Sequence, residues 1–191
     1  MYLYSMRDNS QILQSMRSLL KPGGFRSSGT TFHRAAPNRF IDVINLQGGV
    51  RSLAGRCAVN LGIYIPEYEV VPGRAASPPK EYDCVIRARL SKLVFGEDVW
   101  FDCTDPGAAE LISNLLSSHG LPWFERLSTL DVIAEELKAG RLSNEVGWGM
   151  RATILKGAGE TEAARSFLRG LQGPSPDIIG ALAARIGIDL N

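Results

Sequence analysis

The chain has 191 residues, of which 45% are hydrophobic and 21% are charged, and its formal net charge is +1. This composition excludes an intrinsically disordered chain, a collagen-like repeat and a coiled-coil rod. The length favours one domain, or one domain with an extension, and suffices to bury a core without disulfides or a bound metal.

Charge is distributed unevenly along the chain. Residues 1–56 hold eight Lys or Arg against two Asp or Glu, whereas residues 104–191 hold eight against eleven. A basic front end could meet nucleic acid or an acidic protein. The basic residues are scattered and form no run, which favours an ordinary solvated surface instead.

The cysteines point to a reducing compartment. Cys57, Cys84 and Cys103 are odd in number, 27 and 19 residues apart, and belong to no CxxC or Cys/His cluster, which argues against a disulfide scaffold and a zinc site. The first residues lack the pattern of a signal peptide, and no apolar run approaches the roughly 20 residues of a membrane span. We therefore expect a cytoplasmic protein that contacts no membrane and needs no cofactor.

The first predicted element is an amphipathic helix over residues 10–20, where apolar residues recur at helical spacing before Pro22. Residues 25–90 then read as strands and turns, with strands expected at 31–34, 40–47, 57–65 and 84–90. Odd-numbered positions of 57–65 are apolar, and Cys84 and Leu90 take the inward positions of the last strand. This period of two predicts an antiparallel sheet with one apolar face.

The remainder is predicted to be helical. Asp105-Pro106 is typical of a helix start, Gly120 is expected to end that helix, and residues 121–124 form an apolar connector. Four short helices are expected at about 128–139 (capped by Ser128), 143–156, 161–171 and 175–187. The predicted fold class is α+β: an N-terminal helix and an antiparallel sheet of about four or five strands packed against helices in residues 1–127, with a helical C-terminal extension, residues 128–191, packed on or beside it.

Several segments carry a family resemblance. They are Gly29-Thr30-Thr31-Phe32-His33-Arg34, Val43-Ile44-Asn45-Leu46-Gln47, Glu81-Tyr82-Asp83-Cys84 and Leu121-Pro122-Trp123-Phe124. Over about residues 10–137 the chain resembles the bacterial family known as domain of unknown function (DUF) 4304. The resemblance implies a fold and a set of positions, and it supplies no established reaction. Gly48-Gly49 depart from the polar residue and Ser that often follow the central Gln in the family.

We find no catalytic motif of the GxSxG, HExxH or GxxxxGK[ST] type. His33 and His119 are isolated, which favours structural or surface roles, and Cys84 on an apolar strand face is expected to be an inert thiol.

Two further groups have alternative interpretations. Glu97, Asp98, Asp102 and Asp105 could hold Mg²⁺, but turns and a helix cap explain them more simply. Trp100, Trp123 and Phe124 could stack on nucleic-acid bases, although aromatic residues in an apolar context more often belong to the core.

The second face of the predicted sheet carries the strongest functional signal. By strand parity it collects amides, a phenol and two guanidiniums from three strands, namely Asn45, Gln47, Asn60, Tyr64, Arg87 and Arg89. Two neighbouring guanidiniums require an anion, an acidic partner or acidic residues of the same chain. The alternative interpretation is that the C-terminal helices cover this face and supply those acids.

The function that these residues favour is a non-enzymatic protein-binding module of the bacterial cytoplasm, whose partner is another protein with an acidic surface. An immunity-like role follows by analogy with families that neutralise bacterial toxins. The alternative is a small enzyme or nucleic-acid factor that acts on a phosphate-containing ligand through Arg87 and Arg89. The sequence specifies neither the partner nor the oligomeric state.

Overall fold

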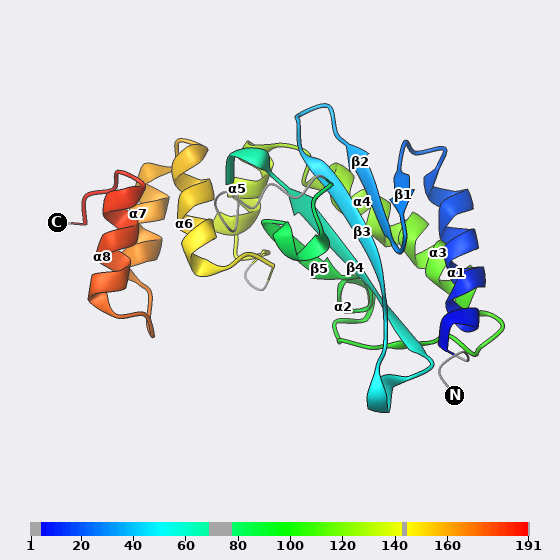
Figure 1. Ribbon diagram of the computed structural model, residues 1–191. Helices are drawn as coiled ribbons and strands as arrows, with labels where there is room; N and C mark the ends of the chain where they lie inside the picture. Colours follow the sequence, from blue (N-terminus) through cyan, green and yellow to red (C-terminus); the bar gives the residue numbers. More distant parts are fainter. Residues whose placement is uncertain (1–4, 69–77, 143–144, 191) are drawn as a thin grey trace. The chain divides into compact units, whose positions relative to one another are not determined.

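In the computed structural model, which describes residues 5–68, 78–142 and 145–190, the chain divides into two units. Met1–Arg126 contains the sheet, and Leu127–Asn191 consists of helices and their connections (Figure 1). The α+β class predicted from the sequence is confirmed.

The sheet is antiparallel throughout. Its strands are β1 (Arg26–Ser28), β2 (Thr31–Ala35), β3 (Ile41–Gly48), β4 (Arg56–Tyr64), β5 (Ile86–Arg89) and β6 (Phe101–Asp102). The order is β1-β2-β3-β4-β5, and β6 pairs with the start of β4. The antiparallel sheet expected from the alternating sequence is confirmed, with two short strands, β1 and β6, beyond those predicted.

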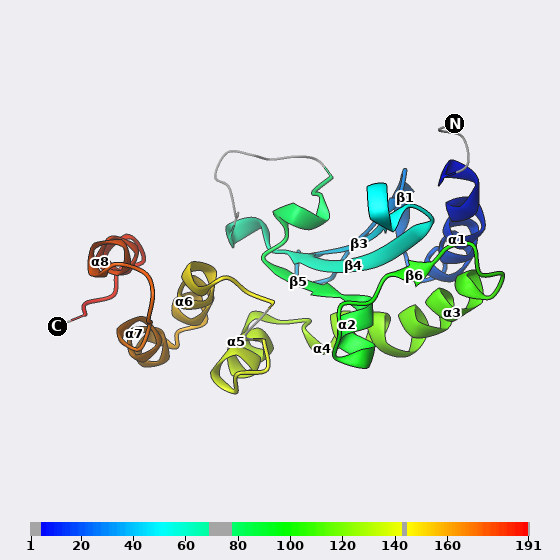
Figure 2. The same ribbon diagram turned by 90° about the horizontal axis from the view of Figure 1, so that it is seen from below.

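One face of the sheet forms the core of the first unit. Leu61 lies opposite Ile44, which lies opposite Phe32, and all three are at most 1% exposed. Helices α1 (Ser5–Leu20), α2 (Leu90–Phe95), α3 (Ala108–Leu115) and α4 (Leu121–Arg126) cover this face (Figure 2). Burying the apolar positions of a period-two pattern requires such a cover on one side only.

Helix α1 is longer than predicted, since it begins at Ser5 instead of Ser10. Its residues Ile12, Met16 and Leu20 follow one another at i, i+4 and i+8 and are at most 2% exposed, so they form the buried stripe. A 2.7 Å hydrogen bond between the Oγ atoms of Ser15 and Ser113 links α1 to α3.

The predicted strand 84–90 is wrong at both ends. Cys84 precedes β5, and Leu90 begins α2. Asn60 pairs with Arg89, whereas Cys57 farther along β4 pairs with Phe101 of β6. Because β6 takes the same edge of β4, the chain must leave that edge after Arg89, and it turns into a helix there.

Gly120 does not end the predicted helix, and residues 121–124 are not a connector. A π-helical turn, Leu116–Gly120, joins α3 directly to α4. A Cβ atom on Gly120 would lie 3.0 Å from Leu116 Cδ2, so the glycine makes room for the Leu116 side chain within this turn. Pro122 lacks the N–H that an α-helical ladder would use, and the wider turn precedes it.

The start of α3 also differs from the prediction. The helix begins at Ala108, three residues after Asp105. Asp105 Oδ1 accepts a 2.8 Å hydrogen bond from the backbone N–H of Gly107, so Asp105 orders the turn before the helix instead of capping it.

A buried ion pair interrupts the helix-covered face. Asp42, 4% exposed, lies opposite Arg34, and Asp42 Oδ2 is 2.7 Å from Arg34 Nη2. The Arg34 guanidinium stands over the Phe25 ring, 4.7 Å from its centroid. Burial raises the pKa of the Asp42 carboxyl, and the hydrogen bond from Arg34 opposes that shift without reversing it.

The second unit contains α5 (Leu130–Lys138), α6 (Trp148–Gly157), α7 (Thr161–Arg169) and α8 (Pro176–Arg185). Ser175 caps α8 by accepting a hydrogen bond from the N–H of Ile178, and Thr129, not Ser128 as predicted, caps α5. Helix α6 begins at Trp148, later than predicted, and residues 143–144 lie outside the described part of the chain.

Among the described residues, none of the helices combines the length and the apolar character that a membrane crossing requires.

Candidate functional site

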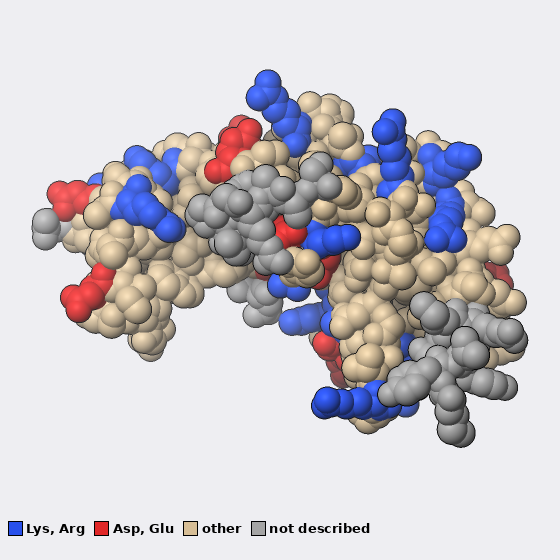
Figure 3. Space-filling model, in the orientation of Figure 1, with Lys and Arg blue, Asp and Glu red and all other residues tan. Residues whose placement is uncertain are grey.

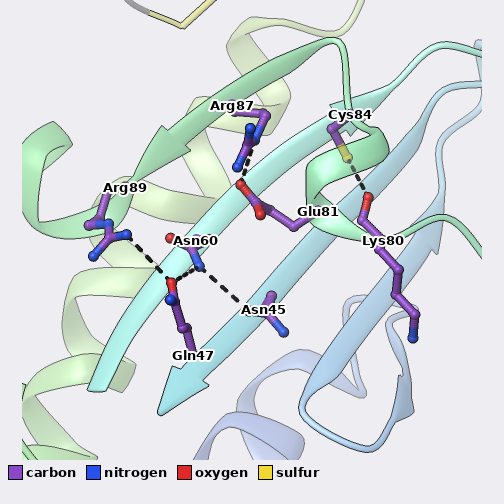
Figure 4. Close-up of polar contacts among 8 residues, drawn as sticks. All are labelled: Asn45, Gln47, Asn60, Lys80, Glu81, Cys84, Arg87 and Arg89. Carbon is purple, nitrogen blue, oxygen red and sulfur yellow. Dashed lines mark hydrogen bonds and ion pairs between the residues drawn. The ribbon is translucent and has the colours of Figure 1, made fainter. Parts of the chain in front are cut away.

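The binding residues predicted from the sequence lie on three neighbouring strands, β3, β4 and β5. They are Asn45, Gln47, Asn60, Tyr64, Arg87 and Arg89. The register places Asn60 opposite both Asn45 and Arg89, so one row of side chains crosses the sheet on the side away from α1–α4 (Figures 2 and 4). Tyr64 is opposite Ile41, at the far end of β4. The common side expected from parity is present, and its use in binding stays a prediction.

Five of these residues form what we call the amide–guanidinium face: Asn45, Gln47, Asn60, Arg87 and Arg89. Its centre is Asn60, which is only 7% exposed. Asn60 Nδ2 donates to Gln47 Oε1 at 3.0 Å and, less closely, to Asn45 Oδ1 at 3.5 Å. Asn45 Nδ2 donates in turn to Thr31 Oγ1 at 3.1 Å. Side chains from β2, β3 and β4 are therefore held in one hydrogen-bonded row, and Figure 4 draws its members from β3 and β4.

Arg89 closes this row at the edge of the sheet. Its Nη2 donates to Gln47 Oε1 at 3.5 Å, and its Nη1 is 3.2 Å from Asp98 Oδ1. The Nη1 contact is an ion pair only, because within the described residues this buried atom has no partner with hydrogen-bond geometry. The guanidinium also lies over the ring of Trp100, with its carbon 5.0 Å from the centroid. Arg89 is thus fixed by stacking more than by strong hydrogen bonds.

Arg87 occupies the next row of the same face. Its Nε donates to Glu81 Oε1 at 2.7 Å, while half of the Arg87 side chain remains exposed. Glu81 and Asp98, the acids that pair with the two arginines, both belong to the first unit and not to the C-terminal helices that the alternative interpretation invoked. Figure 3 views this side of the molecule and shows basic and acidic side chains interspersed over the sheet.

A 3₁₀ turn, η3 (Glu81–Asp83), covers part of this side of the sheet. It is followed by Cys84, whose Sγ would lie 2.5 Å from a Cβ atom on Gly62. Gly62 belongs to the same face as Asn60, so Cys84 packs on the amide side, and the prediction that it faces the apolar side is wrong. Gly62 is required because another segment approaches its backbone this closely.

The Cys84 thiol is held in its protonated form. Burial raises its pKa far above the usual range, with a further contribution from the nearby Glu81 carboxylate, so the thiol stays protonated at neutral pH. Its Sγ donates a weak hydrogen bond to the Lys80 carbonyl at 3.6 Å. The other two cysteines, Cys57 and Cys103, are also buried thiols that belong to no disulfide within the described residues.

His33 stands on the same side of the sheet, where its Nε2 lies 2.8 Å from the Pro79 carbonyl oxygen. Burial lowers the pKa of its imidazole, although this hydrogen bond opposes the shift. The contact ties β2 to the segment that leads into η3, which is a structural role.

The acidic stretch 97–105 performs turn and ion-pair functions. Asp102 Oδ1 accepts hydrogen bonds from the N–H and the hydroxyl of Thr104, which lower the pKa of this exposed carboxyl, and Asp98 pairs with Arg89. The part of the chain that the structure describes holds no group of His, Cys, Asp or Glu arranged for a metal ion.

The aromatic residues separate into two groups. Trp123 and Phe124 are each 3% exposed and pack edge to face in the core, with ring centroids 5.0 Å apart. Trp100 is half-buried and is the residue that stacks on Arg89.

Sequence reasoning missed Glu81, Asp98 and Trp100 as neighbours of the arginines. Glu81 lies six residues before Arg87, and its contact depends on the 3₁₀ turn that folds it back. One signal was available, since Gly62 in the middle of an otherwise regular strand indicates that another segment lies against it.

These features define an α+β protein in which helices cover one face of an antiparallel sheet and amides and guanidiniums occupy the other. The family model described as Domain of unknown function (DUF4304) matches residues 16–126, and the chain belongs to this family. The match ends at Arg126, the last residue of the first unit, so the helical unit lies outside it. Neither the curated proteins nor the solved structures gave a match to this chain.

Proposed function

We propose that the first unit is a protein-binding module whose amide–guanidinium face receives an acidic segment of another protein. The observation that carries this proposal is the in-register row of Asn45, Asn60 and Arg89, with Gln47 and Arg87 beside it. The row brings donors for a peptide backbone and two cations for carboxylates onto one side of a sheet. Blocking of a partner enzyme, as immunity proteins do, is one form that such binding would take.

The exposed ion pair between Arg89 and Asp98 supports a carboxylate ligand. Asp98, the partner of Arg89, is itself 58% exposed, and a surface pair of this kind contributes only about 0–1 kcal/mol to stability. A carboxylate from a partner can therefore replace Asp98 at little cost. A guanidinium binds a carboxylate through two parallel N–H donors, which the single 3.2 Å contact with Asp98 does not use.

The enzymatic alternative receives less support from the same surroundings. A catalytic role would require a reactive group beside Arg87 or Arg89. Cys84 is close enough for the Arg87 charge to act on its pKa, but burial keeps its thiol protonated. No observation at this face favours a reaction over binding.

Selection from a random 12-residue peptide display library on the intact 191-residue chain tests the proposal. We expect enrichment of peptides rich in Asp and Glu, and at least a tenfold weaker Kd by fluorescence anisotropy for the Arg87→Gln/Arg89→Gln variant. The matched control, Arg26→Gln/Arg185→Gln, changes the net charge equally at exposed positions on β1 and α8 and should bind as the wild type does.

Two results would overturn the proposal. One is enrichment of acidic peptides that bind both double variants equally, which would indicate attraction by overall charge. The other is enrichment of members of a random single-stranded oligonucleotide library, in an arginine-dependent way, when no acidic peptide is enriched. That result would favour the phosphate-binding alternative.

A further inference from the structure

Two residues of the segment between α2 and β6 contact Arg89. Asp98 contributes the ion pair at 3.2 Å, and Trp100 contributes the ring on which the guanidinium stacks. Val99, between them, is 41% exposed. An exposed apolar side chain thus lies in the same short segment as both contacts of the Arg89 guanidinium.

A second exposed apolar residue precedes Val99 by four positions in the chain. Phe95, the last residue of α2, is 52% exposed and stands four residues after Ser91, on the same side of the helix. The backbone N–H of Val99 donates to Ser91 Oγ at 3.1 Å, which ties the segment after Gly96 back to α2. We call Phe95, Val99 and Trp100 the apolar rim.

The backbone that carries the apolar rim is already ordered without a partner. Gly96 ends α2 with a left-handed conformation, φ +77°, and Ser91, which anchors Val99, is completely buried. A rim that is already ordered loses little conformational entropy when a partner binds. Trp, Phe and Arg are also the residue types that carry much of the affinity in protein interfaces.

We propose that the partner segment carries a large apolar side chain next to its carboxylate. The carboxylate takes the place of Asp98 on Arg89, and the apolar side chain packs on Phe95 and Val99. This inference rests on the proposed function, because it concerns the edge of the amide–guanidinium face at Arg89 and defines which acidic segments that face prefers. It makes Asp98 an internal competitor that occupies Arg89 until a partner arrives.

The inference predicts opposite effects on the Kd of an acidic peptide for substitutions at neighbouring positions. Asp98→Asn removes the competitor and should tighten binding of an enriched acidic peptide about three- to tenfold. Phe95→Ser/Val99→Ser removes the apolar contact and should weaken it at least tenfold. Val50→Ser, at an exposed large hydrophobic residue outside this segment (74%), is the control and should change nothing.

The experiment measures Kd by fluorescence anisotropy for synthetic peptides taken from the display selection, with the intact chain and these variants. Each peptide is compared with a version in which its apolar residues next to Asp or Glu are changed to Ser, and the melting curve of each variant confirms that it is folded. We expect the Ser version to bind the wild type at least tenfold more weakly than the original peptide does. Its Kd should be the same for the wild type and for the Phe95→Ser/Val99→Ser variant.

Acidic peptides that depend on Arg87 and Arg89 but bind the Phe95/Val99 and Asp98 variants with unchanged Kd would overturn this inference and leave the proposed function in place. The absence of acidic peptides from the selection would instead overturn the proposed function, and this inference with it.

Discussion

The two faces of the sheet are built from alternate residues of the same strands, yet they differ in what holds them in place. Leu61 and Ile63 of β4 are buried beneath helices and make apolar contacts. Asn60, the residue before Leu61, is 7% exposed, and it is held by hydrogen bonds to Gln47 and Asn45. Consecutive residues of β4 therefore divide between a face held by apolar burial and a face held by hydrogen bonds.

The largest expected effect comes from placing a charge on the helix-covered face. Leu61→Asp removes a fully buried side chain and leaves a carboxylate without a partner there, which should cost more than about 4 kcal/mol and abolish cooperative unfolding. Circular dichroism melting checks this, with Val50→Asp as an exposed control. A wild-type melting curve for Leu61→Asp would show that the assignment of the two faces is wrong.

The buried ion pair on the same face should give the next largest effect. Asp42→Asn leaves the Arg34 guanidinium, 23% exposed, without its carboxylate, and we expect a loss of about 2 kcal/mol in urea denaturation at pH 7, below the ~3–5 kcal/mol of a fully buried pair.

The pH dependence of the Asp42 contribution has a definite sign. Because burial raises the pKa of this carboxyl, the folded chain binds more protons than the unfolded chain between the ordinary Asp pKa, about 4, and the folded pKa. The free energy of unfolding of the wild type relative to Asp42→Asn should therefore fall as pH rises through that window and stay constant above it. A relative stability that rises across the window would contradict a raised pKa.

A smaller effect is expected where η3 approaches the amide side. Gly62→Ala would place its methyl group 2.5 Å from Cys84 Sγ and 2.8 Å from Cys84 Cβ, which should cost about 1–3 kcal/mol. Cys84→Gly removes both contacting atoms, so the double variant should recover part of that loss in a double-mutant cycle. Additive losses would mean that the two residues do not touch.

The smallest effect on stability is expected from the arginines. Arg87→Gln/Arg89→Gln removes two ion pairs with exposed members and should change the free energy of unfolding by less than about 1.5 kcal/mol. Loss of cooperative unfolding in this variant would mean that the amide–guanidinium face is a structural element, and the contrast between the two faces would fail.

The local pattern of the sequence was enough to predict the sheet and the side on which each β4 residue lies, because Cys57–Ile65 alternate without interruption. It was not enough for Leu90 and Gly120. Leu90 leaves the strand because β6 competes for the same edge of β4, and Gly120 packs against Leu61, far away in the sequence. Such outcomes depend on contacts between distant segments, which a period of two or 3.6 does not encode.

In the candidate site, too, the local pattern predicts some residues, whereas contacts between distant segments determine others. Asn45, Asn60 and Arg89 could be grouped by parity, because their strands are regular and adjacent. The pairing of Arg89 with Asp98 and Trp100 could not, since it depends on how the chain returns from α2 to β6. In the helical unit, Leu127–Asn191, the start of α8 was predictable because Ser175-Pro176 is an ordinary helix start, whereas the cap of α5 was displaced by one residue, from Ser128 to Thr129.

Nuclear magnetic resonance of the ¹⁵N-labelled chain, titrated with an acidic peptide from the display selection, tests the binding face most directly. The largest shift changes should fall on the side-chain amides of Asn45, Gln47 and Asn60 and on the backbone N–H groups of β5. Shift changes confined to α5–α8, or to α1, α3 and α4, would contradict the assignment of binding to the amide–guanidinium face.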